Sequence, residues 1–265
     1  MDIVREFFGF GGYRRAAEGY LSWEHLSFVT VLLALMTVLA LALGKRYRHR
    51  TEREKNRVLI GAAIAINGFE MIKIVVKCMQ HGMREILYLL PLFLCSVQLI
   101  AIPLAAVSKG RLREAALDFI CIFGPAGALL GTYAAGNNFA AFPVLSVDNV
   151  ISGLTHSLAG FAAVYIYASG MASMKRANIP VTYAIILSFC IPAYVMNHLI
   201  GYNYMFLASG DGTPYDILYD LVGGSRVLYP LGVVGLFLVY IAVYHWGYAL
   251  VRRAQMRRRR AMVIR

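Results

Sequence analysis

Two side chains that could carry out nucleophilic catalysis lie within apolar segments of the chain. Cys95 stands between Pro91 and Pro103 in one apolar run, and His156 lies in a later one. A histidine that removes the proton of a cysteine produces a thiolate, which attacks the carbonyl carbon of an acyl group. Proline bends a helix and frees backbone carbonyl groups, and such breaks favour positions that line a cavity. These residue types indicate acyl-transfer chemistry.

Other polar side chains also occur within apolar segments, where they are costly and therefore candidates for a site. Glu70 and Lys73 are three residues apart on one helical face, so we expect them to neutralise each other as a structural pair. Asp118 is expected to reach water and His245 to lie at the membrane interface. The candidates for substrate binding or for holding an oxyanion are Glu24, His25, Gln98, Asn197, His198, Asn203 and Tyr204.

Cys78, Cys121 and Cys190 are interpreted as inert small apolar side chains. None of the four cysteines has the paired spacing of a zinc site, so we expect no metal and no cofactor.

The composition places these residues in a membrane. The chain has 265 residues, of which 59% are hydrophobic and only 15% are charged, against roughly 25% charged in a typical soluble domain. The net charge of +12 lies in short runs between apolar segments. This distribution is typical of membrane topology and argues against nucleic acid binding.

A helix that crosses the hydrocarbon core needs about 20 mostly apolar residues. We therefore predict an all-α bundle with seven membrane-spanning helices. They occupy residues 24–44, 58–79, 87–107, 115–136, 150–172, 181–207 and 228–250. Residues 1–23 form an extracytoplasmic segment, 24–250 the membrane domain and 251–265 a basic cytoplasmic tail. The fourth span is rich in glycine and alanine, which predicts a central position with close helix contacts.

The distribution of lysine and arginine predicts the orientation of the chain. Segments 45–57, 109–113, 175–176 and 252–265 hold seven, three, two and seven of the 26 basic residues, and they alternate so as to lie on one side. By the positive-inside rule that side is cytoplasmic, so the N-terminus is outside and the C-terminus inside. The tail is interpreted as a topology anchor that also contacts anionic lipid.

With this topology, the polar side chains of separate helices share one depth. Cys95 lies about 12 Å and His156 about 9 Å below the outer ends of their spans, and Glu24 and His25 stand at the mouth of the first span. His198 lies at a similar depth in the sixth span. We therefore expect a polar cavity in the outer half of the bundle.

Several short motifs, taken in order, resemble the YwaF family of bacterial membrane proteins, which is related to eukaryotic transmembrane protein 164. The motifs are Trp23-Glu24-His25, Leu90-Pro91-Leu92-Phe93-Leu94-Cys95, His156 and Asn203-Tyr204-Met205-Phe206-Leu207. The resemblance covers nearly the whole chain. It implies a lipid acyltransferase in which Cys95 is the nucleophile and His156 the base. Many bacterial members have a histidine two residues before the cysteine, whereas this chain has Phe93, so the base is left to His156 or His198.

Together these features predict a membrane-embedded acyltransferase or transacylase of glycerolipids that works through an acyl-thioester on Cys95. Water as acceptor would make it a lipid-ester hydrolase. The expected partners are membrane phospholipids and lysolipids, in the inner membrane if the chain is bacterial. A transporter or channel with an outward polar vestibule is the alternative, although no inverted repeat supports it. A haem protein with His156 and His198 as ligands is a third hypothesis. A retinal protein is not expected, because the seventh span has no lysine to form a Schiff base.

Overall fold

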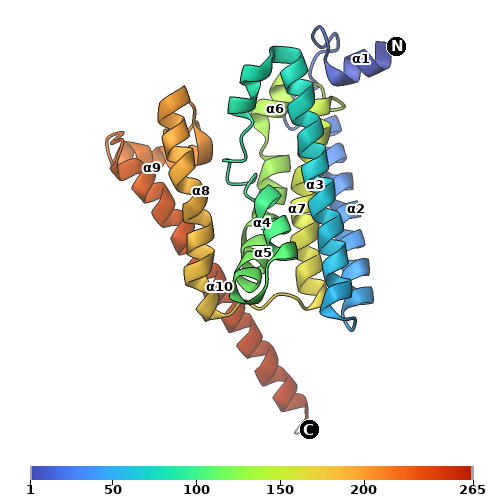
Figure 1. The fold of residues 1–265 in the computed structure, drawn as a ribbon, viewed down its shortest axis with the longest axis vertical. Helices are drawn as coiled ribbons and strands as arrows, with labels where there is room; N and C mark the ends of the chain where they lie inside the picture. Colours follow the sequence, from blue (N-terminus) through green and yellow to red (C-terminus); the bar gives the residue numbers. More distant parts are fainter. Residues whose placement is uncertain (1, 264–265) are drawn as a thin grey trace.

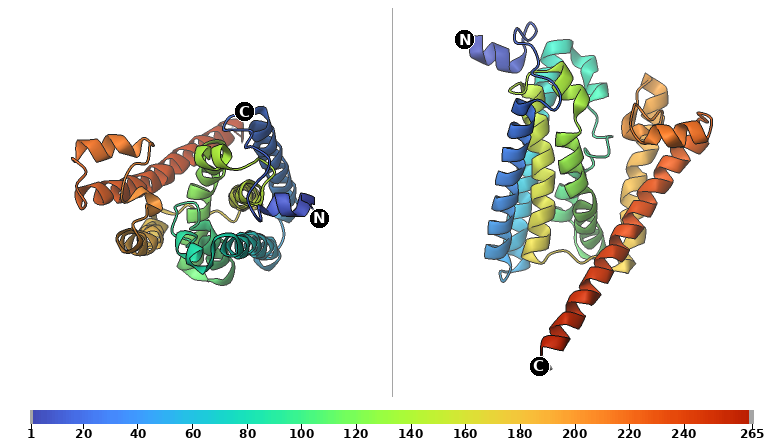
Figure 2. Two further views of the ribbon diagram at one scale, coloured as in Figure 1. Left: turned by 90° about the horizontal axis from the view of Figure 1, so that it is seen from above. Right: turned by 180° about the vertical axis from the view of Figure 1, so that it is seen from behind.

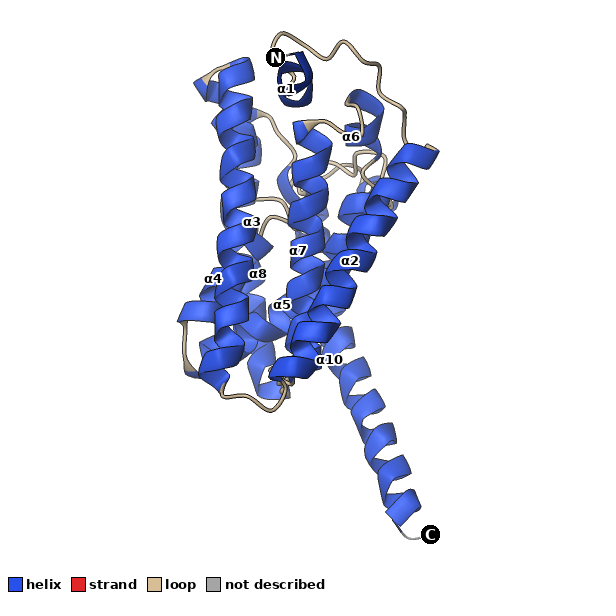
Figure 3. Ribbon diagram, turned by 90° about the vertical axis from the view of Figure 1, so that its right-hand side faces the viewer, coloured by secondary structure: helices blue, strands red, loops and turns tan. Residues whose placement is uncertain are grey.

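The computed structural model describes residues 2–263, and every regular element in that range is a helix (Figures 1 and 3). Six of the helices are long and apolar enough to cross a membrane. They are α2 (Trp23–Tyr47), α3 (Glu52–His81), α5 (Gly110–Tyr133), α7 (Val147–Ser169), α8 (Ile179–Ile200) and α10 (Leu228–Val263). The shorter ones are α1 (Asp2–Phe8), α4 (Gln98–Val107), α6 (Gly136–Ala141), α9 (Tyr215–Leu221) and the 3-10 turns η1 (Met83–Tyr88), η2 (Arg176–Asn178) and η3 (Tyr204–Phe206). In the basic tail 251–265, residues 264–265 and the side chains from 258 onward lie outside the described residues.

Helix α7 is the centre of the larger helix group and packs against α2, α3 and α5 (Figure 2). Helices α5 and α7 approach closely because small residues face each other. A methyl group added at Gly124 would stand 2.8 Å from the carbonyl oxygen of Ala159. The predicted central position of the glycine-rich span is confirmed, since 67% of the apolar window of α5 is buried.

Helices α8, α9 and α10 form a second group beside this bundle (Figure 1). Helix α8 packs against both α5 and α10, and so joins the two groups. It ends at Gly201, whose left-handed φ of 65° closes the helix, as glycine commonly does after a last turn. The sixth predicted span, 181–207, therefore extends about two turns beyond the end of α8 at Ile200.

The third predicted span, 87–107, is not one continuous helix. It consists of the end of η1, a non-helical segment over 89–97 and the short helix α4. Pro91 has no N–H group and disfavours helical geometry at Leu90, so one helix is not expected to run through this point. The prediction of a helix over the whole stretch is wrong, and the count of seven spans stays a prediction.

A neighbouring side chain satisfies the backbone at the second proline of this stretch. Pro103 lies inside α4 and cannot donate to the carbonyl group of Leu99. That carbonyl instead accepts a hydrogen bond of 3.0 Å from the Asn67 side chain of α3. Broken helices persist in membranes where neighbouring helices bind the freed groups in this way.

The two ends of the molecule differ in charge, as the sequence predicts. Segments 48–51, 108–109 and 170–178 lie at the same end as the C-terminus, and we call this the basic end (Figure 1). Residues 2–22, η1, α6 and the segment 201–227 lie at the opposite end, which we call the N-terminal end. The basic loops therefore share one end.

Two polar residues near the basic end differ from their predicted positions. Asp118 is fully buried and accepts hydrogen bonds from the Met174 backbone (2.8 Å) and the Asn178 side chain (2.7 Å), so it holds the α7–α8 connection rather than reaching water. His245 is 2% exposed and therefore also lies inside the protein, not at an interface.

Candidate functional site

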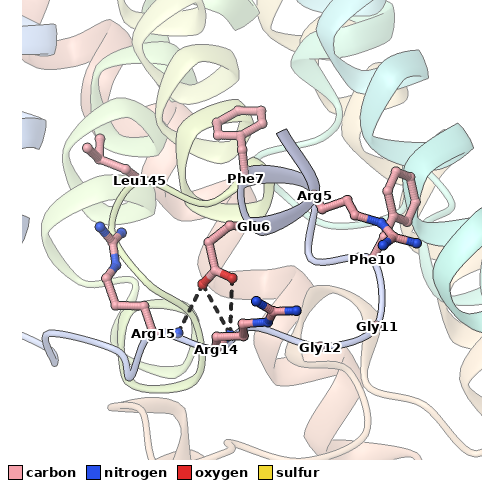
Figure 4. A pocket seen from close by; sticks show the side chains of 9 residues that line it. All are labelled: Arg5, Glu6, Phe7, Phe10, Gly11, Gly12, Arg14, Arg15 and Leu145. Atoms are coloured by element: carbon pink, nitrogen blue, oxygen red, sulfur yellow. Dashed lines mark hydrogen bonds between the residues drawn. The ribbon is translucent and has the colours of Figure 1, made fainter. Parts of the chain in front are cut away.

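A cavity on the surface of the N-terminal end contains none of the predicted catalytic residues (Figure 4). It measures about 720 Å³ and lies between α1, the following loop and Leu145. The Glu6 carboxylate shapes it by accepting hydrogen bonds from the backbone N–H groups of Arg14 and Arg15, at 3.1 and 2.9 Å. The exposed pocket is therefore formed by the fold of residues 5–15 and offers no nucleophile.

A smaller cavity of about 120 Å³ inside the bundle brings Cys95 and His156 together. The non-helical segment supplies Cys95, α7 supplies His156 and α3 supplies the third wall. The complete lining is Ile66, Glu70, Lys73, Phe93, Cys95, Ser96, Leu99, Ser152, Thr155 and His156. A thiol, an imidazole, an ion pair and three hydroxyl groups thus share one small space.

Cys95 is half-buried and stands three residues before the first residue of α4. The segment turns here, because the Val97 N–H donates to Phe93 at 3.2 Å and the Gln98 N–H to Cys95 at 3.3 Å. Within the described residues, the N–H groups of Cys95 and Ser96 donate to no backbone carbonyl. The thiol of Cys95 is therefore flanked by two backbone N–H groups that no backbone carbonyl binds.

His156 shares one face of α7 with Ser152, which lies four residues before it. The adjacent Thr155 also lines the cavity. Gly131 of α5 leaves room for the imidazole, because a methyl group there would overlap three atoms of the ring. At Gly127, one turn away, a methyl group would meet only Cys95 Cβ, at an ordinary 4.0 Å. Helix α5 therefore sets the position of the base.

Glu70 and Lys73 form the predicted ion pair, with 2.6 Å between Oε1 and Nζ. Their pairing is confirmed, but both also line the Cys95 cavity. An ammonium group there can attract a lipid phosphate or a developing negative charge. The pair thus belongs to the site as well as to the structure.

His25 is a buried structural residue rather than part of this cavity. Its Nδ1 accepts the Leu21 N–H at 3.1 Å, so Nε2 carries the hydrogen and donates to the Thr132 carbonyl at 3.1 Å. The ring stacks on Phe139 with centroids 3.7 Å apart. Glu24 is exposed and lines a surface groove on α2. These contacts fix the start of α2 against α5 and α6.

Asn197 and His198 line a second cavity, between α8 and α10. The Asn197 amide binds the backbone of Tyr204 through both its oxygen (2.6 Å) and its nitrogen (3.0 Å). Asn203 holds its own loop by donating to Ser209 at 2.9 Å. Neither amide lines the Cys95 cavity, and both already have protein partners.

Tyr204 connects this loop to the segment that carries Cys95. Its ring packs edge-on against Phe93, with centroids 4.9 Å apart, and its hydroxyl donates to the Leu87 carbonyl. It therefore supports the cavity wall from outside.

Gln98 is 1% exposed, and neither atom of its amide has a partner among the described residues. It begins α4 but does not line the cavity. Sequence reasoning missed Ser96, Ser152 and Thr155, although the four-residue spacing of Ser152 with His156 is a signal that could have found Ser152.

The fold and the cavity define a class: an integral membrane protein with a polar site inside a bundle of apolar helices. The family model of the TMEM164 family matches residues 20–252, and the chain belongs to this family. The predicted resemblance to transmembrane protein 164 is confirmed, whereas the relation to the YwaF family stays a prediction. Comparison with curated proteins and with solved structures gave no match.

Proposed function

We propose that the protein transfers acyl groups between membrane glycerolipids through an acyl-thioester on Cys95. The observation that carries this proposal is a cavity lined by both Cys95 and His156, two residues that lie 61 positions apart in the sequence. Membership of the TMEM164 family agrees with a lipid-related activity in a membrane.

In the first half-reaction, His156 takes the thiol proton and the thiolate adds to the ester carbonyl carbon of a phospholipid. The carbon–oxygen ester bond breaks, and the leaving lysolipid oxygen takes the proton from the imidazolium. The acyl group is then a thioester on Cys95.

In the second half-reaction, His156 removes the proton of an acceptor hydroxyl, whose oxygen attacks the thioester. The carbon–sulfur bond breaks and the thiolate recovers the proton from His156. A lysolipid as acceptor gives a new phospholipid, and water gives a free fatty acid.

The backbone N–H groups of Cys95 and Ser96 are our candidates for holding the oxyanion, because no backbone carbonyl among the described residues binds them and they are adjacent to the thiol. These two N–H groups replace the side chains of Asn197, His198 and Asn203 as the proposed oxyanion donors. None of those three side chains lines the Cys95 cavity. One such donor contributes roughly 3–4 kcal/mol to transition-state stabilisation in well-studied hydrolases.

The proposal is tested with purified protein, a phospholipid labelled in its acyl chain and an unlabelled lysolipid. Labelled acyl groups should appear on the lysolipid with the native protein and not with Cys95→Ala. Unchanged transfer by this variant contradicts the proposal.

The Gly131→Ala variant is expected to lower acyl transfer by about 10²-fold, the scale of a 1 Å displacement of a catalytic group. The added methyl group would overlap the His156 ring, which must move away. Thermal stability should not fall in parallel, because alanine favours a helix more than glycine does. Gly127→Ala is the matched control, and equal rates for the two variants would contradict the assignment of His156.

We also propose that the N-terminal end faces outside, since the basic loops lie at the other end. Arg84 in η1 and Arg50 before α3 are both exposed, at opposite ends. A membrane-impermeant maleimide should label Arg84→Cys in intact cells and Arg50→Cys only after permeabilisation. The reverse pattern would move the proposed site to the cytoplasmic leaflet.

A further inference from the structure

A further hollow, open to the surface, lies between α8 and α10, which pack against each other (Figures 1 and 2). We call it the apolar slot. It measures about 370 Å³, within the range of small-ligand pockets. Its walls are aliphatic side chains of both helices: Leu187, Ile191 and Val195 of α8 and Pro230, Leu231 and Val234 of α10. Space of this composition suits a hydrocarbon chain.

The cavity lined by Asn197 and His198 adjoins this slot toward the N-terminal end, and Leu207 lines both. It measures about 110 Å³, and we call it the polar mouth of the slot. Tyr194 of the slot packs on the His198 ring of the mouth, with centroids 4.4 Å apart. Its hydroxyl donates to the Arg226 carbonyl at 3.2 Å. The slot and its mouth thus form one amphipathic site.

Two side chains at the mouth are candidates for binding an anion, those of Tyr229 and Arg226. Tyr229 is 1% exposed, and its buried hydroxyl has no hydrogen-bond partner among the described residues. Buried hydroxyl groups are rarely left in this condition. The exposed Arg226 has no carboxylate within 4.0 Å in the described part of the chain. His198 Nδ1 donates to the Tyr194 carbonyl at 2.9 Å, so Nε2 of the neutral ring is an acceptor and is not counted as a donor to an anion.

We propose that this site binds a long-chain fatty acid, with the carboxylate at Arg226 and Tyr229 and the chain in the slot. The planar guanidinium matches a carboxylate with two parallel hydrogen bonds, and the Tyr229 hydroxyl supplies a third donor. The mouth is small, which favours a carboxylate over a glycerophosphate head group. Asn197 lines the mouth but is bound to Tyr204, so it is not counted as a donor.

The test measures binding of radiolabelled oleate to the full chain in detergent micelles, with oleyl alcohol as a matched uncharged competitor. Oleate should bind, and the alcohol should compete at least about 10-fold more weakly, the scale of one charged hydrogen bond. Arg226→Gln should weaken oleate binding by a similar factor. Arg84→Gln, which changes another exposed arginine at the same end, should have no effect.

Tyr229→Phe separates binding from folding. It should weaken oleate binding several-fold without lowering thermal stability, because the hydroxyl has no partner to lose. Three results would overturn the proposal: equal binding of oleate and oleyl alcohol, equal effects of the two arginine variants, or stronger competition by a lysophospholipid of the same chain. Cys95→Ala should bind oleate normally, so failure of this site and failure of the acyl-transfer proposal are distinguishable.

Discussion

Acyl transfer should fall by at least about 10³-fold in the Cys95→Ala variant, because no other thiol lines the cavity. Removing a catalytic nucleophile costs up to about 10⁶-fold in a well-studied protease, with the residual rate coming from the remaining oxyanion donors and binding groups. His156→Gln should lose about 10²–10⁴-fold, the usual contribution of a positioned general base. Initial rates at saturating lysolipid measure both losses.

The matched control is Cys78→Ala. Cys78 is a half-buried free thiol on α3, as Cys95 is on its segment, but it does not line the cavity. Its removal should leave transfer unchanged. Mass spectrometry of the native protein incubated with phospholipid alone should find the acyl mass on Cys95, where hydroxylamine removes it. An adduct on Cys78 instead, or equal rates for the two alanine variants, would refute the mechanism.

The free energy of unfolding should fall by about 3–5 kcal/mol in the Asp148→Ala variant, the usual cost of leaving a buried charge without its partner. The Asp148 carboxylate lies 2.5 Å from the Lys77 ammonium, and the two side chains are only 6% and 11% exposed. Asp148 also accepts a hydrogen bond of 2.9 Å from the Tyr13 hydroxyl. Burial and then the nearby carboxylate raise the pKa of Tyr13 well above its usual value, so the phenol remains a donor. Denaturant titration in mixed micelles measures the change.

Two comparisons make this result specific. Lys175→Ala removes an exposed ion pair with Glu114, in which the side chains are 58% and 34% exposed, and should cost no more than about 1 kcal/mol. The double variant Lys77→Met with Asp148→Leu removes both charges and should recover most of the stability lost in Asp148→Ala. A loss in Asp148→Ala as small as that in Lys175→Ala would show that Lys77 is solvated.

Much of the fold follows from local features that the sequence states directly. A run of about 20 apolar residues can satisfy its backbone in a membrane only as a helix, so most of the spans were predictable. Small residues in 115–136 predicted a central span with close helix contacts, and the structure shows that α7 is one of its partners. Pro91 and Pro103 marked the site of the break, but the run of apolar residues over 87–107 still favoured one continuous helix, and this was wrong.

The candidate site was only partly predictable, because sequence gives depth along a helix more readily than rotation about its axis. The rise of 1.5 Å per residue placed Cys95, His156, His25 and His198 in one layer. Which side each faces depends on how the helices pack, and the packing separates these residues into three places. His25 lies against Thr132 and Phe139, His198 lies between α8 and α10, and only Cys95 and His156 share a cavity.

The ion pair between Glu70 and Lys73 shows the same difference between local contacts and helix packing. Glu70 and Lys73 are three residues apart on one helix, so their contact is local and the sequence alone determined it. Their presence beside Cys95 required α3 to pack with that face toward the broken segment, which the contact between Asn67 and the Leu99 carbonyl helps to fix. The sequence therefore determined the helices, the basic loops and the reactive residue types. Only the tertiary structure decided which of those residues meet, because long-range packing sets the rotation of each helix.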